Sequence, residues 1–229
     1  MDIQANITAI GEIIQRTANA CGRNPENIEL IAVSKRQDSA KIRDAHECGQ
    51  NIFAENYLQE ARDKIPRCPP EICWHFIGHL QANKTAAAVD LFDMIQTVDR
   101  PKIVRRIQRH AEQIGKLQKI LVQVNVGRER QKSGILPEET QPLLELINRQ
   151  PNIMVQGLMT IPPWTDNPEQ SRPYFRELRE LSVVLAAKGL FADSRHVTLS
   201  MGMSGDFTVA IEEGATMVRV GTALFGPRP

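Results

Sequence analysis

The feature that most constrains the fold is an alternation of strand-length apolar runs with segments of helical period. Helical segments lie at 38–48, 101–114 and 137–148, where apolar residues recur every three to four positions. Strands that alternate with helices become parallel neighbours joined by right-handed crossovers. Eight such units favour a closed (β/α)8 barrel, a TIM barrel of the α/β class. The eight expected strands are residues 28–35, 51–57, 73–78, 94–99, 120–126, 154–161, 196–201 and 217–226.

We expect a single domain over residues 1–229, with a leading helix at 2–21 before a barrel at 28–226. No Gly/Ser-rich linker, short repeat or block of like charge marks a boundary within it. An open Rossmann-like sheet is the alternative architecture. It is disfavoured because no G-x-G-x-x-G motif follows the first strand.

Charge and hydropathy limit the classes of partner. The 28 Lys and Arg residues balance 27 Asp and Glu residues, which gives no general attraction to nucleic acid or to a membrane surface. No apolar stretch reaches the roughly 20 residues that span a bilayer, and the acidic start of the chain is unlike a signal peptide. The 4 irregularly spaced cysteines indicate free thiols and no metal site. We expect a cytoplasmic monomer that acts on a small ligand.

Polar side chains share the strand faces that should point into the barrel. Residues two apart on a strand face the same way, so Gln123 and Asn125 lie opposite a row of valines and an isoleucine. On the sixth strand, Gln156, Leu158 and Thr160 are expected to repeat this pattern. These polar side chains could then form hydrogen bonds with a ligand in the barrel interior. The alternative is that they form hydrogen bonds with one another.

Two cations are placed to act on a ligand, because the active site of this barrel lies at the carboxyl ends of its strands. Lys35 ends the first strand on the same face as Ile31 and Val33. An inward lysine near an arginine should have a lowered pKa, and its free amine can form a Schiff base with a carbonyl. A solvated cap is the alternative for Lys35. Arg219 should also point inward, where a buried guanidinium needs an acceptor such as a pyridine nitrogen or a deep acid like Glu29.

Glycine-rich turns follow the seventh and eighth strands. The run MGMSGD occupies positions 201–206, and Gly221 and Thr222 end the eighth strand. In barrels of this type these two loops and a nearby helix start bind phosphate through backbone N–H groups. Such a turn can also serve only to shape the backbone. A lysine that attacks an aldehyde, a phosphate site and a donor for a ring nitrogen together describe pyridoxal 5′-phosphate (PLP).

The strings AVSK, ENY, WHFIGHLQANK, QKSG, GLMTI, LSMGMSGDF and MVRVGTALFG occur in this order along essentially the whole chain. Together they resemble the pyridoxal phosphate homeostasis protein family. The resemblance implies a single-domain barrel like the N-terminal domain of alanine racemase, with PLP held as an aldimine on Lys35 and its pyridine nitrogen facing Arg219. Further expected cofactor contacts are Asn56 and, around the phosphate, Ser200, Met201, Gly202, Ser204, Gly221 and Thr222.

Two positions depart from the pattern of that family. Ala54 stands where glycine is common, and its methyl group is tolerated if φ is negative. Gln131 stands where serine is common, so the following loop of Lys132, Ser133 and Gly134 is not counted as a cofactor contact.

Two histidines and a tyrosine lie near these motifs. Strand parity places His75 in the barrel interior and His79 in a loop, so shared metal ligation is not expected. We favour a structural hydrogen bond for His75. Tyr57, next to Asn56, is a candidate proton carrier.

These features favour a PLP-binding protein of cofactor homeostasis, which holds PLP without specific turnover and has apo PLP enzymes as candidate partners. A pyridine nitrogen kept unprotonated by Arg219 is a weak electron sink. The second domain of related racemases, with its catalytic tyrosine, is not expected after LFGPRP. The alternatives are a racemase-like enzyme using Lys35 and Tyr57 as bases, a sugar-phosphate-binding barrel or Schiff-base aldolase, and an adaptor docked through the basic segment RPKIVRRIQRH.

Overall fold

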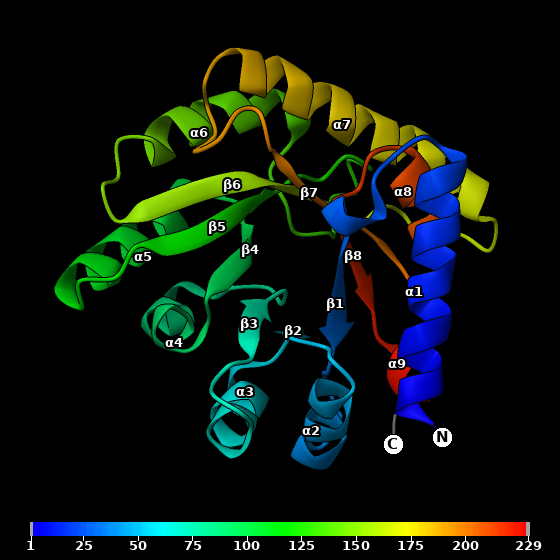
Figure 1. Ribbon diagram of the computed structural model, residues 1–229. Helices are drawn as coiled ribbons and strands as arrows, with labels where there is room; N and C mark the ends of the chain where they lie inside the picture. Colours follow the sequence, from blue (N-terminus) through cyan, green and yellow to red (C-terminus); the bar gives the residue numbers. More distant parts are fainter. Residues whose placement is uncertain (1, 228–229) are drawn as a thin grey trace.

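The computed structural model describes residues 2–227 and shows a closed barrel of parallel strands in sequence order (Figure 1). β1 pairs in parallel with both β2 and β8, which closes the ring. The TIM barrel of the α/β class is therefore confirmed. The strands are β1 (Glu29–Val33), β2 (Ile52–Glu55), β3 (Cys73–Phe76), β4 (Met94–Val98), β5 (Gln118–Gln123), β6 (Ile153–Met159), β7 (Thr198–Met203) and β8 (Met217–Val220).

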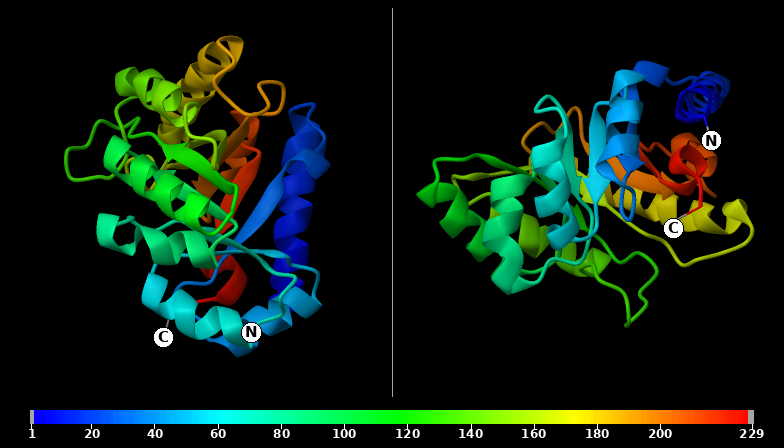
Figure 2. Two further views of the ribbon diagram at one scale, coloured as in Figure 1. Left: turned by 90° about the vertical axis from the view of Figure 1, so that its left-hand side faces the viewer. Right: turned by 90° about the horizontal axis from the view of Figure 1, so that it is seen from below.

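Helices follow the strands and surround the barrel (Figures 1 and 2). Asp38 caps α2 by accepting a hydrogen bond from the Lys41 backbone, and Pro101 occupies the first turn of α5 as expected. The helices are α1 (Ile3–Ala20), α2 (Ser39–Glu47), α3 (Leu58–Lys64), α4 (Thr85–Leu91), α5 (Pro101–Gln113), α6 (Thr140–Ile147), α7 (Arg172–Ala187), α8 (Phe207–Glu212) and α9 (Thr222–Phe225).

The leading helix α1 packs against the last elements of the chain. It lies beside α8 and α9, which Figures 1 and 2 both show. Ile10, Ile14 and Ala18 recur every four residues and form its buried face. The Asn6 side chain donates a hydrogen bond of 2.8 Å to the Leu224 carbonyl. The expected helix at 2–21 is thus present, and it covers the region where the barrel closes.

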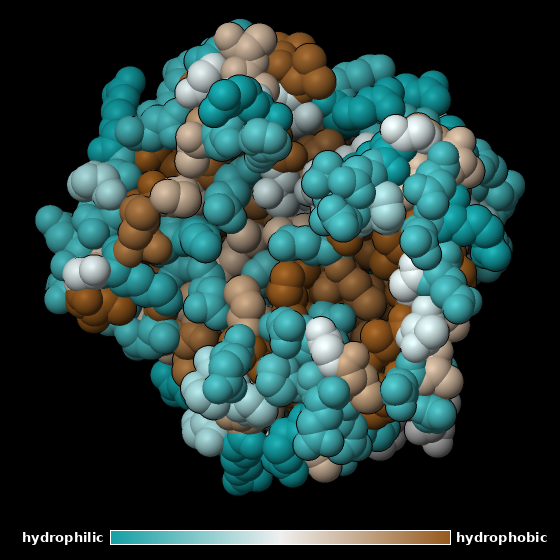
Figure 3. All heavy atoms as spheres, viewed as in Figure 1, coloured by the Kyte–Doolittle hydropathy of each residue, from teal (hydrophilic) through white to brown (hydrophobic). Residues whose placement is uncertain are grey.

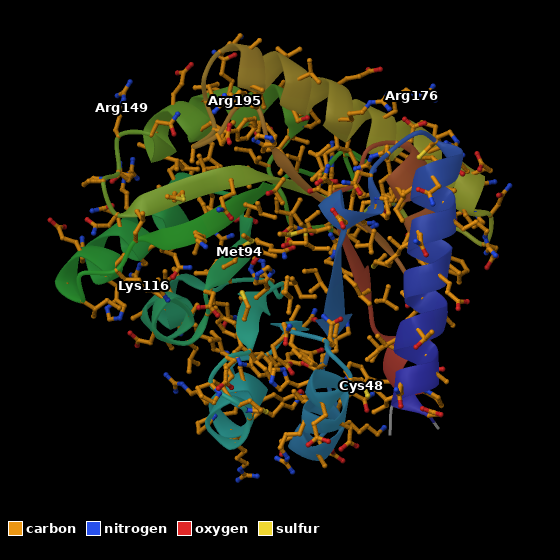
Figure 4. All side chains as sticks on the ribbon, viewed as in Figure 1. Cys48, Met94, Lys116, Arg149, Arg176 and Arg195 are labelled. Carbon is orange, nitrogen blue, oxygen red and sulfur yellow. The ribbon has the colours of Figure 1, made fainter. Side chains whose placement is uncertain are left out.

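The apolar core has two parts. A large outer core fills the space between strands and helices, and a smaller inner core lies inside the ring of strands. Met94, at the start of β4, lies toward the middle of this ring in Figure 4. Polar groups join the inner core, as the strand parity predicts. The inner apolar residues are Ile31, Val33, Ala54, Ile77, Met94, Leu121, Met159 and Met217.

The prediction of which β6 side chains face the barrel interior is wrong beyond the middle of this strand. The register between β5 and β6 shifts between Ile120 and Leu121, where the pairing on β6 skips one residue. An extra residue reverses the side on which the following side chains point. Leu158 therefore packs in the outer core, while Met159 faces the inner one.

Hydrophilic residues cover most of the rim of the face shown in Figure 3, and hydrophobic ones show mainly in recesses toward its centre and right. No helix within residues 2–227 combines the length and the apolar character that crossing a bilayer requires. Ala54, where the related family commonly has glycine, is fully buried and its φ is not positive, so its methyl group is accommodated.

Candidate functional site

A pocket opens at the carboxyl ends of the strands, where the fold predicts a site. It brings together six of the residues expected from the sequence: Lys35, Asn56, Ser204, Arg219, Gly221 and Thr222. Its other lining residues are Val33, Ile77, Ile161 and Met203. Sequence reasoning did not single out these apolar residues as part of a site. Val33 could have been identified from the sequence, because it lies on the same inward strand face as Lys35.

The backbone immediately before Lys35 is held by a buried ion pair. The Lys64 ammonium donates to the Ser34 carbonyl at 2.9 Å and to Glu55 Oε1 at 2.8 Å. The Ser34 hydroxyl donates to the same Glu55 oxygen at 2.8 Å. Ser34 and Glu55 are fully buried, so these contacts fix the end of β1 against β2. Lys35 itself is partly buried and lines the pocket.

Asn56 presents a buried acceptor to the pocket. Its Oδ1 is shielded from solvent and has no hydrogen-bond partner within residues 2–227. A buried amide oxygen is almost always paired in native proteins, so a ligand that donates a hydrogen bond here would satisfy it. Gly78, just after β3, allows the Asn56 backbone to approach closely. A Cβ at position 78 would lie only 1.9 Å from the Asn56 carbonyl oxygen.

Arg219 is a buried cation whose hydrogen-bond partners in the described part of the chain are neutral. Its side chain donates from Nη1 to Ser200 Oγ at 2.7 Å and from Nη2 to the Thr160 carbonyl at 2.8 Å. Burial lowers the pKa of Arg219 to about 10, which leaves it charged at neutral pH. Glu29, the alternative partner, is exposed at the start of β1, two positions before the residue that pairs with Arg219. A guanidinium has five N–H donors, so further donors are available to a ligand.

Ser200 lies behind Arg219 and does not line the pocket. Its hydroxyl accepts from Arg219 and donates to Gln96 Oε1 at 2.6 Å, and both Ser200 and Gln96 are fully buried. The sequence placed Ser200 correctly on β7 but gave no sign that it faces Gln96, which lies 104 positions earlier on β4.

Met201 and Gly202 also support the pocket from behind. The Met201 side chain is fully buried in the outer core. Gly202 has a φ of +91°, and a Cβ there would lie 2.6 Å from the Ala210 Cβ of α8. Glycine is required for this close contact as well as for the backbone conformation. Met203, at the end of β7, and Ser204, just after it, reach the pocket instead.

The two histidines are separated, as expected. His75 is buried inside the barrel, with Nδ1 2.9 Å from Gln96 Nε2, and burial lowers its pKa to about 4. His79 is exposed, with Nδ1 2.8 Å from Ser133 Oγ. Tyr57 is about half exposed and is not among the pocket-lining residues. Within residues 2–227, no group of three or more His, Cys, Asp and Glu side chains is placed to hold a metal ion.

The loop after β5 lies at the rim of the barrel. The Lys132 ammonium forms an ion pair with Glu129 and donates to the Pro162 carbonyl at 3.0 Å. Neither Lys132 nor Ser133 is among the residues that line the pocket. These contacts tie together the loops that follow β5 and β6.

Comparison with protein families and curated relatives gives full-length matches. The family model for the alanine racemase N-terminal domain matches residues 6–229. The pyridoxal phosphate homeostasis protein of Vibrio alginolyticus is 42% identical over 231 residues, which cover 99% of this chain and 97% of the relative. That of Aquifex aeolicus is 41% identical over 229 residues, covering 100% and 99%. That of Escherichia coli is 40% identical over 235 residues, covering 99% and 97%.

Solved structures share the barrel. A protein of unknown function from Bifidobacterium adolescentis superposes with a TM-score of 0.90 at 31% identity, covering 98% of this chain and 94% of that chain. PipY of Synechococcus elongatus, solved with PLP bound, has a TM-score of 0.80 at 34% identity, covering 93% and 100%. Alanine racemase from Corynebacterium glutamicum shares the fold, with a TM-score of 0.73 at 16% identity over 99% of this chain and 61% of that chain. The chain therefore belongs to the pyridoxal phosphate homeostasis protein family, whose barrel is that of the alanine racemase N-terminal domain.

Proposed function

We propose that this protein binds PLP in the pocket at the strand ends, linked to Lys35 as a Schiff base, and that it serves PLP homeostasis. The observation that carries the proposal is the convergence of Lys35, Asn56 and Arg219 on one pocket from three different strands. The names of the curated relatives and the PLP-bound structure of PipY support the same ligand.

The residues present fit this cofactor. A buried arginine with only neutral partners leaves its charge and further N–H donors available for a pyridine nitrogen. The unpaired Asn56 Oδ1 can accept a hydrogen bond from the ligand. Ser204, Gly221 and Thr222 lie where the loops after β7 and β8 meet the pocket, so we assign the phosphate to them. PLP supplies an aldehyde and an electron-withdrawing ring.

Ser200, Met201 and Gly202 take indirect roles in this proposal. Ser200 contacts Arg219, and Met201 and Gly202 hold the β7 end against the outer core and α8. Their side chains act on the ligand through these neighbours, although backbone groups of the loop remain candidates for phosphate contacts.

We further propose that the protein does not turn over amino acids. Proton transfer on both faces of a bound amino acid requires two titratable groups within hydrogen-bond reach. Of the lining residues, Lys35 has the only side chain suited to proton transfer, since Arg219 stays charged and the others do not titrate. An arginine facing the ring nitrogen also keeps that nitrogen unprotonated, which weakens the ring as an electron sink.

In this role the partners are PLP itself and apo enzymes that take it up in the cytoplasm. The protein would act as a monomer, which sedimentation of the loaded protein tests directly.

The test is the visible absorption spectrum of the purified protein during titration with PLP. Wild type should develop the band of a Schiff base, and Lys35→Ala should not. Lys119→Ala, which removes an exposed lysine at the start of β5, should behave as wild type. The loaded protein should racemise neither L- nor D-amino acids. A wild type without the band would contradict PLP binding through Lys35, whereas measurable racemisation would favour the enzyme alternative.

A further inference from the structure

A chain of buried polar side chains runs through the barrel interior behind Arg219. Arg219 Nη1 lies 2.7 Å from Ser200 Oγ, which lies 2.6 Å from Gln96 Oε1. Gln96 Nε2 lies 2.9 Å from His75 Nδ1, and His75 Nε2 lies 3.5 Å from Cys73 Sγ. The first four of these residues are no more than 3% exposed. Among these five hydrogen-bonded side chains, only that of Arg219 lines the pocket.

The donors along this chain all point in one direction. A guanidinium can only donate, so Ser200 Oγ accepts from it and turns its own hydrogen toward Gln96 Oε1. The Gln96 amide then presents its NH2 group to His75, whose Nδ1 must carry no hydrogen. His75 is therefore neutral, with its hydrogen on Nε2 toward Cys73. Burial agrees with this state, because it lowers the pKa of His75 to about 4.

We propose that Ser200, Gln96 and His75 are positioning residues that hold the guanidinium of Arg219 toward the pocket. A free arginine side chain populates many rotamers. Here Ser200 and the Thr160 carbonyl fix two of its nitrogens, and Ser200 is itself fixed by Gln96. The inference rests on the proposed function, since the orientation of Arg219 matters when a ring nitrogen occupies the pocket.

The second part of the inference is that the hydrogen-bonded side chains behind Arg219 are uncharged. Because Ser200, Gln96 and His75 carry no charge, these side chains do not neutralise the positive charge of Arg219, and the acidic charge that acts on Arg219 comes from Asp206, just after β7. A carboxylate at position 96 would stand one hydroxyl away from the guanidinium. The negative charge of this carboxylate would partly neutralise the positive charge of Arg219 from the interior side. It would also require His75 to donate from Nδ1, because a carboxylate only accepts.

The test compares Gln96→Leu with Gln118→Leu in the full chain. Gln118 is also fully buried, but its amide donates to the carbonyls of Phe92 and Asp93, away from Arg219. PLP affinity by spectral titration, the absorption maximum of the bound cofactor and the thermal midpoint are measured for each protein. Ser200→Ala, a smaller change that removes the acceptor of Arg219, serves as a second variant if Gln96→Leu does not fold.

Gln96→Leu and Ser200→Ala should weaken PLP binding by about tenfold, as expected for one lost buried hydrogen bond, and should shift the absorption maximum. Gln118→Leu should lower the thermal midpoint and leave affinity and absorption unchanged. Wild-type affinity and absorption in both Gln96→Leu and Ser200→Ala would overturn this inference while leaving PLP binding intact. A wild type that binds no PLP would overturn the proposed function and this inference with it.

A second measurement needs no cofactor. Nitrogen-15 NMR of the unloaded protein should show the His75 hydrogen on Nε2, with no protonation of the ring above about pH 5. In Gln96→Glu the same ring should carry a hydrogen on Nδ1. A wild-type ring protonated at Nδ1 would contradict the direction of the chain, whether or not PLP binds.

Discussion

At the scale of single residues, the pocket depends on the buried guanidinium of Arg219 and the buried Oδ1 atom of Asn56, whose hydrogen-bonding capacity residues 2–227 do not exhaust. Arg219 has neutral partners on its inner side, and Asn56 Oδ1 has none within residues 2–227. Buried polar groups left in this state destabilise a fold unless a ligand completes them. PLP binding should therefore raise the thermal midpoint as well as generate colour.

Arg219→Glu tests the contact with the ring nitrogen. The variant should retain PLP but change its absorption spectrum, because a carboxyl group at this position favours a protonated pyridine nitrogen. It should also lower stability, since the Thr160 carbonyl loses its donor. Arg23→Gln is the control, because Arg23 donates to the Ile211 carbonyl, outside the pocket. An unchanged spectrum of bound PLP in Arg219→Glu would count against the contact.

Gly78→Ala tests the close approach of β3 to Asn56. The added Cβ would lie 1.9 Å from the Asn56 carbonyl oxygen, so the backbone must move. We expect a loss of about 3 kcal/mol in the free energy of unfolding, as for an overpacked site, and weaker PLP binding. Gly11→Ala in α1 meets nothing within 4 Å and should gain about 0.5 to 1 kcal/mol from helix propensity. Equal stability of the two variants in urea would show that the contact is not tight.

At the scale of elements, the ion pair of Lys64 and Glu55 joins α3 to the ends of β1 and β2. Lys64→Met leaves the fully buried Glu55 carboxylate without its cation and should cost about 3 kcal/mol of stability. Adding Glu55→Gln should recover part of this loss, because the remaining group is neutral. Urea unfolding of the single and double variants measures both effects. A double variant no more stable than Lys64→Met would contradict the assignment of the loss to an unpaired buried charge.

The short helix α8 is held against α7 by Glu213. This nearly buried carboxylate accepts from Arg176 at 2.9 Å and Arg172 at 3.2 Å, and lies 3.0 Å from Arg179. Burial alone would raise the pKa of Glu213, but the hydrogen bonds from Arg176 and Arg172 and the charge of Arg179 lower it on balance. The contribution to stability is therefore present above the unfolded pKa, about 4.3, and is lost as pH falls through the folded value.

Glu213→Gln should accordingly lower the free energy of unfolding by about 2 kcal/mol at pH 7, as for lost hydrogen bonds to a charged group. It should also flatten the fall in stability that the wild type shows as pH drops below the unfolded pKa of about 4.3 and through the lowered folded pKa of Glu213. Thermal midpoints of both proteins from pH 7 to pH 3 give the comparison. Parallel profiles of wild type and Glu213→Gln would show that protonation of Glu213 does not cause the loss of stability at acid pH.

The strand faces illustrate what local sequence predicts at this scale. Parity placed Lys35, His75 and Arg219 on the inner side because their strands are regular up to those residues. It failed for Leu158, because the register shift between β5 and β6 depends on the neighbouring strand as well as on the sequence of β6 itself. Gly157, which lies at the shift, is a local indication of it, since a glycine inside a strand often marks a bulge.

At the scale of the whole molecule, the closed barrel explains why the pocket was predictable. All strand ends of such a barrel meet at one rim, so Lys35, Asn56 and Arg219 converge once the topology is known. The chain of Ser200, Gln96 and His75 was not predictable, because its link from Gln96 on β4 to Ser200 on β7 crosses the barrel between strands that do not pair. Which side chains meet across the interior depends on packing in three dimensions.

The most direct measurement is reduction of the PLP-loaded wild-type protein with borohydride, followed by peptide mapping by mass spectrometry. Reduction makes a Schiff base permanent and marks the lysine that formed it. The account predicts one phosphopyridoxyl group per chain, on the peptide containing Lys35, and none in Lys35→Ala treated in the same way. A label on another lysine of the wild type, or no label on a protein that has bound PLP, would contradict it.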